Sequence, residues 1–283
     1  MIEEEILLRN QEISNTSTGN NNGSIGNNWY MLALFMIGLF SALAFANTST
    51  RKSLTSMLRY LGIGVKRVPR VIKELKRKGF HFSGLVIPLI YLLGLNYSTF
   101  ITRKFAYTLM GAISLGYFIW ECLRVYVPPV GRFCQRVYGH MMREKEKNGR
   151  FNGVLFYLIG TAVSLYMFSP LVAIACSLFL IIGDFCAALV GISYGKTKIG
   201  NKSLEGSLAM FAVCFFISLG IFWSCPLVEQ LSLYGALSAT LVELLNPSFI
   251  DDNLTIPCLS GLAIHLIAAR LQITIPDPSI MVM

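Results

Sequence analysis

Charged residues are scarce in this chain. Asp, Glu, Lys and Arg make up 14 % of its 283 residues, whereas a soluble globular domain has about 25 %. Hydrophobic residues make up 54 %. This composition excludes an ordinary soluble domain and predicts a polytopic, all-α membrane protein. The net charge of +9 does not indicate a nucleic-acid partner, because the basic residues are gathered in a few loops between apolar runs.

Signals for several other classes of site are also missing. The seven cysteines include no CxxC pair, which excludes a zinc or disulfide framework and predicts cysteines packed as small apolar residues. The acidic start and the late first apolar run exclude a signal peptide. GISYGKT has three residues between Gly191 and Gly195, where a P-loop needs four, so no P-loop is predicted.

Long apolar runs dominate what is present. A membrane-spanning helix needs roughly 17–25 residues, and two of the runs are short, so we expect seven or eight spans. The N-terminal tail is rich in Asn and polar, which predicts disorder. The expected division is a tail (1–28), an anchor span with a basic amphipathic segment (29–69), a membrane domain (70–275) and a second tail (276–283). The apolar runs lie at 29–46, 79–95, 105–123, 153–168, 170–192, 206–228, 231–245 and 254–275.

The basic residues predict the orientation of these spans. Loops 47–78, 124–152 and 193–205 carry ten, seven and three Lys or Arg residues, and they fall on one side if there are eight spans. The positive-inside rule makes that side cytosolic. Glu121 and Arg124, at the cytosolic end of the span at 105–123, have helical spacing and are predicted to form a structural ion pair.

Asp184 is the first candidate functional residue, because it follows SLFLIIG inside an apolar run. A carboxylate at the centre of a membrane helix costs roughly 2.5–3.5 kcal/mol, so it is expected to face a cavity, a metal or a cation. A structural ion pair inside the bundle is the alternative. Small residues share its helix face, and a loop rich in Gly and Lys follows. Its candidate nucleotide-binding residues are Gly191, Gly195, Lys196, Lys202 and Glu205.

Two further groups of polar residues fall on the same predicted side. Glu74, Arg77, Lys78 and His81 have helical spacing and would share one face, where Arg and Lys suit phosphate binding. Asp251 and Asp252 lie in the loop immediately before the last span. Mg²⁺ prefers one or two carboxylates together with substrate phosphates. The candidate metal ligands are therefore Asp184, Glu205, Asp251 and Asp252, for Mg²⁺ or another divalent cation such as Ca²⁺.

Five motifs in order resemble the CTP-dependent lipid kinases, which include dolichol, phytol and diacylglycerol kinases. The resemblance covers about residues 70–265 and is nearest to the yeast-type diacylglycerol kinase. The motifs are Arg77-Lys78-x-x-His81, Phe151-Asn152-Gly153, Asp184-x-x-Ala187-Ala188-x-x-Gly191-x-x-x-Gly195-Lys196, Asn201-Lys202-Ser203-x-x-Gly206-Ser207 and Asp251-Asp252-Asn253-x-Thr255-x-Pro257.

The resemblance implies transfer of the γ-phosphoryl group of CTP to the hydroxyl of diacylglycerol, giving phosphatidate, in the membrane of the endoplasmic reticulum or nuclear envelope. It implies functional roles for Arg77, Lys78, Asp184 and Gly191. The expected partners are CTP, a divalent cation and a membrane lipid. Three alternatives remain at this point: a dolichol or polyprenol kinase, a phosphatidate cytidylyltransferase, and a transporter with Asp184 as its ion site.

Overall fold

The computed structural model describes a bundle of helices packed around one central helix. It describes residues 55–98, 100–139, 142, 144–245 and 250–277. The expected N-terminal tail, the anchor span at 29–46 and the last six residues lie outside this range.

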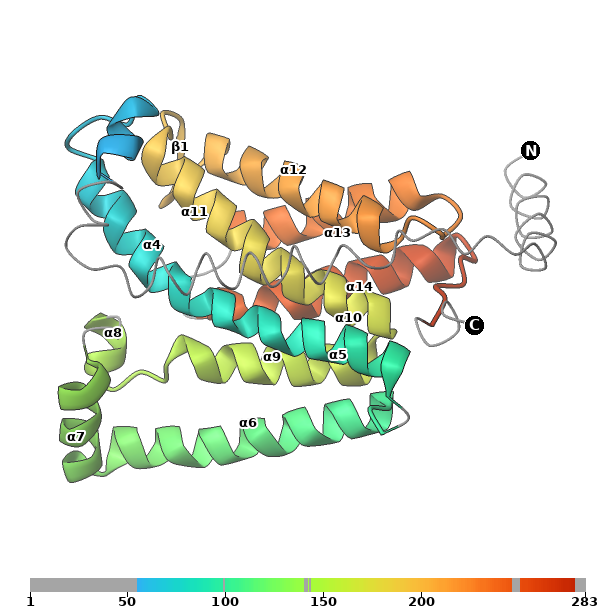
Figure 1. The fold of residues 1–283 in the computed structure, drawn as a ribbon, viewed down its shortest axis with the longest axis horizontal. Coiled ribbons are helices and arrows are strands. Elements are labelled where there is room, and N and C mark those ends of the chain that lie inside the picture. Colours follow the sequence, from blue (N-terminus) through green and yellow to red (C-terminus); the bar gives the residue numbers. More distant parts are fainter. Residues whose placement is uncertain (1–54, 99, 140–141, 143, 246–249, 278–283) are drawn as a thin grey trace.

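Helices and one small hairpin make up the described structure (Figure 1). The elements on the N-terminal side are α4 (Val68–Phe82), the 3₁₀ turn η1 (Ser83–Leu85), α5 (Val86–Tyr97), α6 (Arg103–Tyr126), α7 (Pro128–Tyr138) and α8 (Glu144–Lys147). Those that follow are α9 (Gly153–Met167), α10 (Pro170–Leu178), the π-helical turn η2 (Phe179–Gly183), α11 (Asp184–Ser193), β1 (Lys198–Ile199), β2 (Lys202–Ser203), α12 (Leu204–Ile221), α13 (Val228–Leu245) and α14 (Asp252–Arg270).

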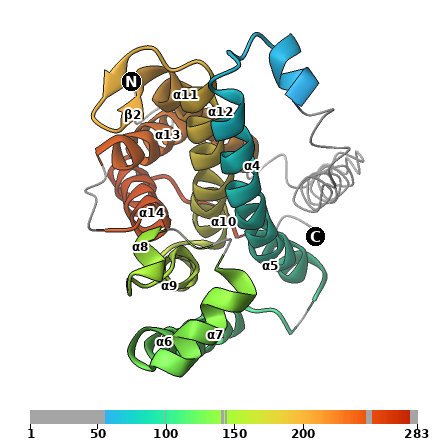
Figure 2. The same ribbon diagram turned by 90° about the vertical axis from the view of Figure 1, so that its left-hand side faces the viewer.

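The central helix is the continuous run α10–η2–α11. Of its most apolar stretch, 78 % is buried inside the protein, against 17 % for α6. The other helices pack in sequence around it, with α4 and α12 against α11, α13 against α12, α14 against α13, and α9 against α14. Helix α6 packs against α9 at the edge of the bundle, which the end-on view shows (Figure 2). Its exposed apolar side chains therefore suit contact with lipid.

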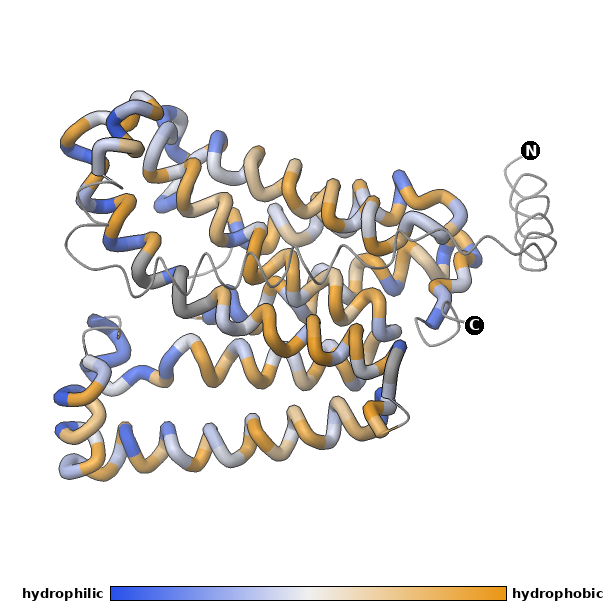
Figure 3. The backbone as a smooth tube through the Cα atoms, viewed as in Figure 1, coloured by the Kyte–Doolittle hydropathy of each residue, from blue (hydrophilic) through white to orange (hydrophobic). Residues whose placement is uncertain are grey.

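The expected membrane spans that lie within the described residues overlap with helices. Four of the described helices are long and apolar enough to cross a membrane: Arg103–Tyr126, Pro170–Ser193, Leu204–Ile221 and Asp252–Arg270. Two shorter apolar helices, Ser83–Asn96 and Gly153–Met167, accompany them. The all-α, multi-pass class is thus confirmed, while the count of seven or eight spans stays a prediction. Hydrophilic residues gather at the end that holds the hairpin, α7 and α8 (Figure 3).

Local sequence explains how the elements near that end begin. Pro69 lies in the first turn of α4, where its missing N–H costs no hydrogen bond. The Oγ of Ser203 caps α12 by accepting from the backbone N–H of Gly206. The hairpin turns at Gly200, whose φ of +57° is a left-handed conformation that favours glycine. This hairpin forms part of the loop rich in Gly and Lys that the sequence predicted between the two spans.

Candidate functional site

The Asp184 carboxylate is paired with Lys78. Asp184 begins α11 directly after the π-helical turn, a distortion that is common at functional sites. The Lys78 ammonium, on α4, forms an ion pair with Oδ2 of Asp184 and lies 3.4 Å from its backbone oxygen. Both residues are less than 5 % exposed. The predicted cationic partner of Asp184 is therefore a residue 106 positions earlier in the chain.

A second ion pair lies between the hairpin and α13. The Lys202 ammonium, on β2, pairs with Oε1 of Glu243, which is 3 % exposed. Burial by itself lowers the pKa of Lys202, but the carboxylates of Glu243 and Asp184 outweigh burial and raise it. Lys202 therefore stays protonated throughout the physiological pH range.

Both ion pairs line one polar cavity of about 220 Å³ at the hairpin end of the bundle. This volume is below the range of about 300–1,000 Å³ usual for small-molecule sites, and it suits a chain of phosphates better than a whole nucleotide. Six parts of the fold contribute its walls: α4, α11, the hairpin, α12, α13 and α14. The lining residues are Glu74, Lys78, Asp184, Ala187, Ala188, Gly191, Ile192, Lys198, Asn201, Lys202, Ser203, Gly206, Ser207, Glu243 and Asp252.

Small residues let α11 and α12 approach closely beside this cavity. A Cβ on Gly206 would lie 2.5 Å from the carbonyl oxygen of Ala187, and one on Gly191 would lie 2.8 Å from Oγ of Ser203. Real Cβ atoms essentially never come this near to another heavy atom. Gly191 therefore permits close packing against Ser203 of its own chain. Close approach of a nucleotide to Gly191 stays a prediction.

Several of the predicted site residues lie away from this cavity. Oε1 of Glu205 accepts hydrogen bonds from the backbone N–H groups of Lys196 and Thr197, at 2.9 and 3.0 Å. Glu205 and Lys196 line a second cavity, which is also lined by Ser193 and Tyr194 at the end of α11. Gly195 packs against Ser203. These contacts fix the start of the hairpin.

The two acids before the last span have different positions and contacts, because α14 begins between them. Asp251 caps α14, since its Oδ1 accepts from the backbone N–H of Asn253 at 3.1 Å. Asp252, one residue later, lines the polar cavity. Arg77 and His81 lie on α4 as expected, but their side chains are outside the described part of the structure, so their roles stay predictions.

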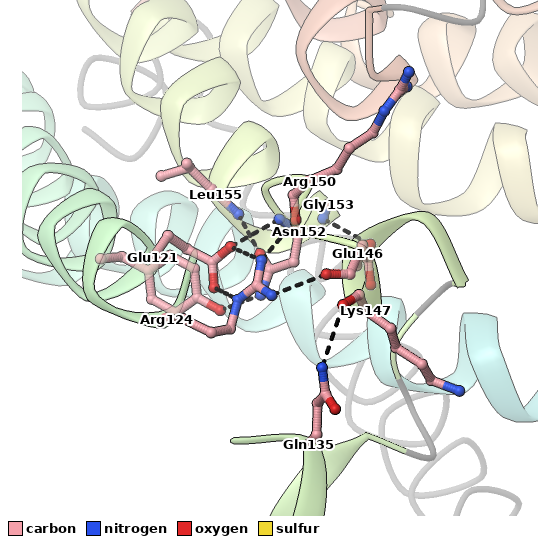
Figure 4. A network of polar contacts seen from close by, with 10 residues as sticks. Glu121, Arg124, Gln135, Glu146, Lys147, Arg150, Asn152, Gly153 and Leu155 are labelled. Atoms are coloured by element: carbon pink, nitrogen blue, oxygen red, sulfur yellow. Dashed lines mark hydrogen bonds and ion pairs between the residues drawn. The ribbon is translucent and has the colours of Figure 1, made fainter. Parts of the chain in front are cut away.

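A buried polar network supports α14 from the loop at 124–152 (Figure 4). Arg124 donates to both carboxylate oxygens of Glu121, at 2.7 and 2.8 Å, which confirms the predicted ion pair. It also donates to the backbone oxygens of Glu146 and Arg150, at 3.0 and 2.6 Å. The backbone N–H of Asn152 donates to Glu121 Oε2 at 2.9 Å. These contacts satisfy both charges of the pair.

The network reaches the cavity through Gly153. Its backbone N–H donates to Oε1 of Glu146 at 3.2 Å, and its carbonyl oxygen accepts from Nδ2 of Asn253 at 3.0 Å. Asn253 is fully buried and directly follows Asp252. The motif Phe151-Asn152-Gly153 thus positions the helix that carries Asp252, and none of its three residues lines the cavity.

Glu243 is the cavity residue that the sequence analysis missed. The signal that marked Asp184, an acid inside an apolar run, is present here too, in GALSATLVELL. Glu243 lies near the end of its run, where acids are usually solvated. The packing of α13 against α12 and α14 buries it instead.

The described residues include no cluster of three or more His, Cys, Asp or Glu side chains placed to hold a metal ion. A cation that is bound partly by substrate phosphates needs only one or two protein carboxylates. Asp184, Glu243 and Asp252 line the cavity, and Oε2 of Glu243 is buried without a hydrogen-bond partner. The residues present therefore fit a cation that arrives with a nucleotide.

Several known proteins that are similar to this chain are lipid kinases. No family model and no solved structure matches it. A CTP-dependent diacylglycerol kinase of Schizosaccharomyces pombe is 34 % identical over 69 % of this chain and 93 % of its own length. Its Saccharomyces cerevisiae counterpart is 32 % identical, over 69 % and 73 %. A probable chloroplastic phytol kinase of Glycine max is 30 % identical over 41 % and 43 %. The chain therefore belongs to the family of CTP-dependent lipid kinases.

Proposed function

We propose that this protein transfers the γ-phosphoryl group of CTP to the hydroxyl of diacylglycerol, forming phosphatidate and CDP. The observation that carries the proposal is the cavity at the polar end of a membrane bundle, which is lined by the buried pair of Lys78 and Asp184 and by a second pair in which the carboxylate of Glu243 is buried. Two relatives that match 69 % of the chain at 34 % and 32 % identity are named CTP-dependent diacylglycerol kinases, which supports this proposal.

The cavity residues suit phosphoryl transfer, which depends on positioning and on charge neutralisation. Lys78 and Lys202 supply positive charge to the phosphates, and we propose that Arg77 adds to it. The lipid hydroxyl oxygen forms a bond to the γ-phosphorus as the bond from that phosphorus to the β–γ bridging oxygen breaks. CDP leaves, and the hydroxyl proton passes to a carboxylate. A bound divalent cation would further neutralise the phosphate oxygens.

Asp184 is the carboxylate that we assign to the lipid hydroxyl. It lies nine residues before the end of α11 at Ser193, a distance of about 14 Å along the helix. This places it deeper among the apolar spans than the hairpin lysine, on the side from which a membrane lipid would enter. We propose that the polar end faces the cytosol, and that the host membrane is the endoplasmic reticulum or nuclear envelope.

A labelling experiment tests donor and acceptor together. Membranes that contain the protein would receive γ-labelled CTP or ATP, with diacylglycerol, dolichol or phytol as the acceptor. We expect label in phosphatidate from CTP only, and its loss in Asp184→Asn. Label in dolichyl or phytyl phosphate would identify a prenol as the acceptor. Release of the label as pyrophosphate, with CDP-diacylglycerol formed from CTP and the phosphatidate of the membrane, would indicate a cytidylyltransferase.

A further inference from the structure

Glu243 is a buried acid in which one carboxylate oxygen forms an ion pair and the other has no hydrogen-bond partner within the described structure. Its Oε1 pairs with Lys202, while Oε2 is buried and accepts no hydrogen bond within the described structure. The residue is 3 % exposed and lines the polar cavity. A buried carboxylate oxygen without a partner is costly, because desolvation is not compensated. Such an oxygen suits a ligand that occupies the cavity.

The charge of the cavity indicates which ligand that is. A nucleoside triphosphate is strongly anionic, and a cavity that binds it needs an excess of positive charge. Among the described side chains that line the cavity, acids outnumber lysines by four to three. A divalent cation would correct this balance and would be attracted to the acids. The acids are Glu74, Asp184, Glu243 and Asp252, and the lysines are Lys78, Lys198 and Lys202.

We propose that Glu243, through Oε2, is a ligand to the divalent cation that accompanies the phosphates of the nucleotide. Glu243 lies two residues before the end of α13, beside the lysine of the hairpin, whereas Asp184 lies deeper and is held by Lys78. We therefore assign a different role to each of the two acids. Glu243 holds the cation on the phosphate side, and Asp184 serves the lipid hydroxyl. This inference rests on the proposed function, because it takes the nucleotide as the occupant.

Manganese binding tests the inference without turnover. The full-length protein, purified in detergent, would be titrated with Mn²⁺ in the presence of the non-hydrolysable analogue β,γ-imido-CTP, and free Mn²⁺ would be measured by electron paramagnetic resonance. We expect Glu243→Gln to weaken Mn²⁺ binding by at least about tenfold. Glu229→Gln is the matched control, because Glu229 lies in the first turn of the same helix, at the end away from the cavity. This control should bind Mn²⁺ as the wild type does.

A second pair of variants separates ligation from support of Lys202. Lys202→Gln keeps Glu243 but loses a phosphate contact, so the variants are compared at a saturating concentration of the analogue. Under that condition Lys202→Gln should still bind Mn²⁺ more tightly than Lys202→Gln/Glu243→Gln. This double variant removes both charges of the pair, so it also replaces Glu243→Gln if that protein does not fold. Equal loss in Lys202→Gln and in the double variant would overturn the inference, because Glu243 would then act only through Lys202.

Two further outcomes would also overturn it: wild-type Mn²⁺ affinity in Glu243→Gln, or no nucleotide-dependent Mn²⁺ binding by the wild type. Failure of the proposed function has a different signature. If Mn²⁺ binding depends on Glu243 but no lipid becomes labelled from CTP, the inference about the cation stands and the proposed kinase activity fails.

Discussion

Replacing Asp184 by asparagine is expected to damage stability as well as turnover. The substitution would leave the Lys78 ammonium without its counter-charge, in a place where Lys78 is 3 % exposed. Removing one partner of a buried ion pair costs about 3–5 kcal/mol, because the remaining charge is desolvated without compensation. At roughly 2–4 °C per kcal/mol, the melting temperature should fall by on the order of 10 °C.

The double variant Lys78→Met/Asp184→Asn separates the two effects. It removes both charges, and replacing a buried pair by neutral residues is often neutral or stabilising. We therefore expect its melting temperature, measured by intrinsic fluorescence in detergent, to return to within a few degrees of the wild type. Its kinase activity should stay at least about 10²-fold below the wild type, as expected when a proton-transfer group is lost. A double variant as unstable as the single one, or an active double variant, would refute this reasoning.

Three further changes give distinct expected results. Gly206→Ala should destabilise the protein by about 1–3 kcal/mol, since its Cβ would lie 2.5 Å from a carbonyl oxygen of α11. Gly116→Ala on α6, which has open space around it, should leave the stability unchanged. Thermal unfolding of the two variants measures the difference. Glu121→Gln should lower the melting temperature, and the folded fraction should keep wild-type turnover, because Glu121 is buried in the supporting network away from the cavity. Lys202 should react with acylating reagents at pH 9 more slowly than the exposed Lys198, because the pKa of Lys202 is raised above 10.5 and its ammonium group stays protonated. Mass spectrometry of labelled peptides measures the order of reaction. Faster labelling of Lys202 would mean that its carboxylate partners do not stabilise the charge.

The sequence by itself determined the membrane class, the positions of the helices and the identity of one central acid. The free energy of inserting a helix is a sum over neighbouring residues, so apolar runs mark spans without knowledge of their packing. The run at 170–192 became the helix Pro170–Ser193, and the run at 105–123 became α6. Asp184 was recognisable for the same reason, because the cost of a charge inside an apolar run is local.

Only the tertiary structure decided the partners of these charges. Lys78 and Asp184 are 106 residues apart, and Lys202 and Glu243 are 41 apart, so no local spacing could pair them. Glu205 stays a predicted cation ligand, and only the structure shows that its Oε1 accepts two backbone N–H groups at the start of the hairpin. Glu243 had the appearance of a solvated acid near a span end, yet helix packing buries it beside Lys202. Coulomb interactions depend on distance and burial, and both arise only when the helices pack.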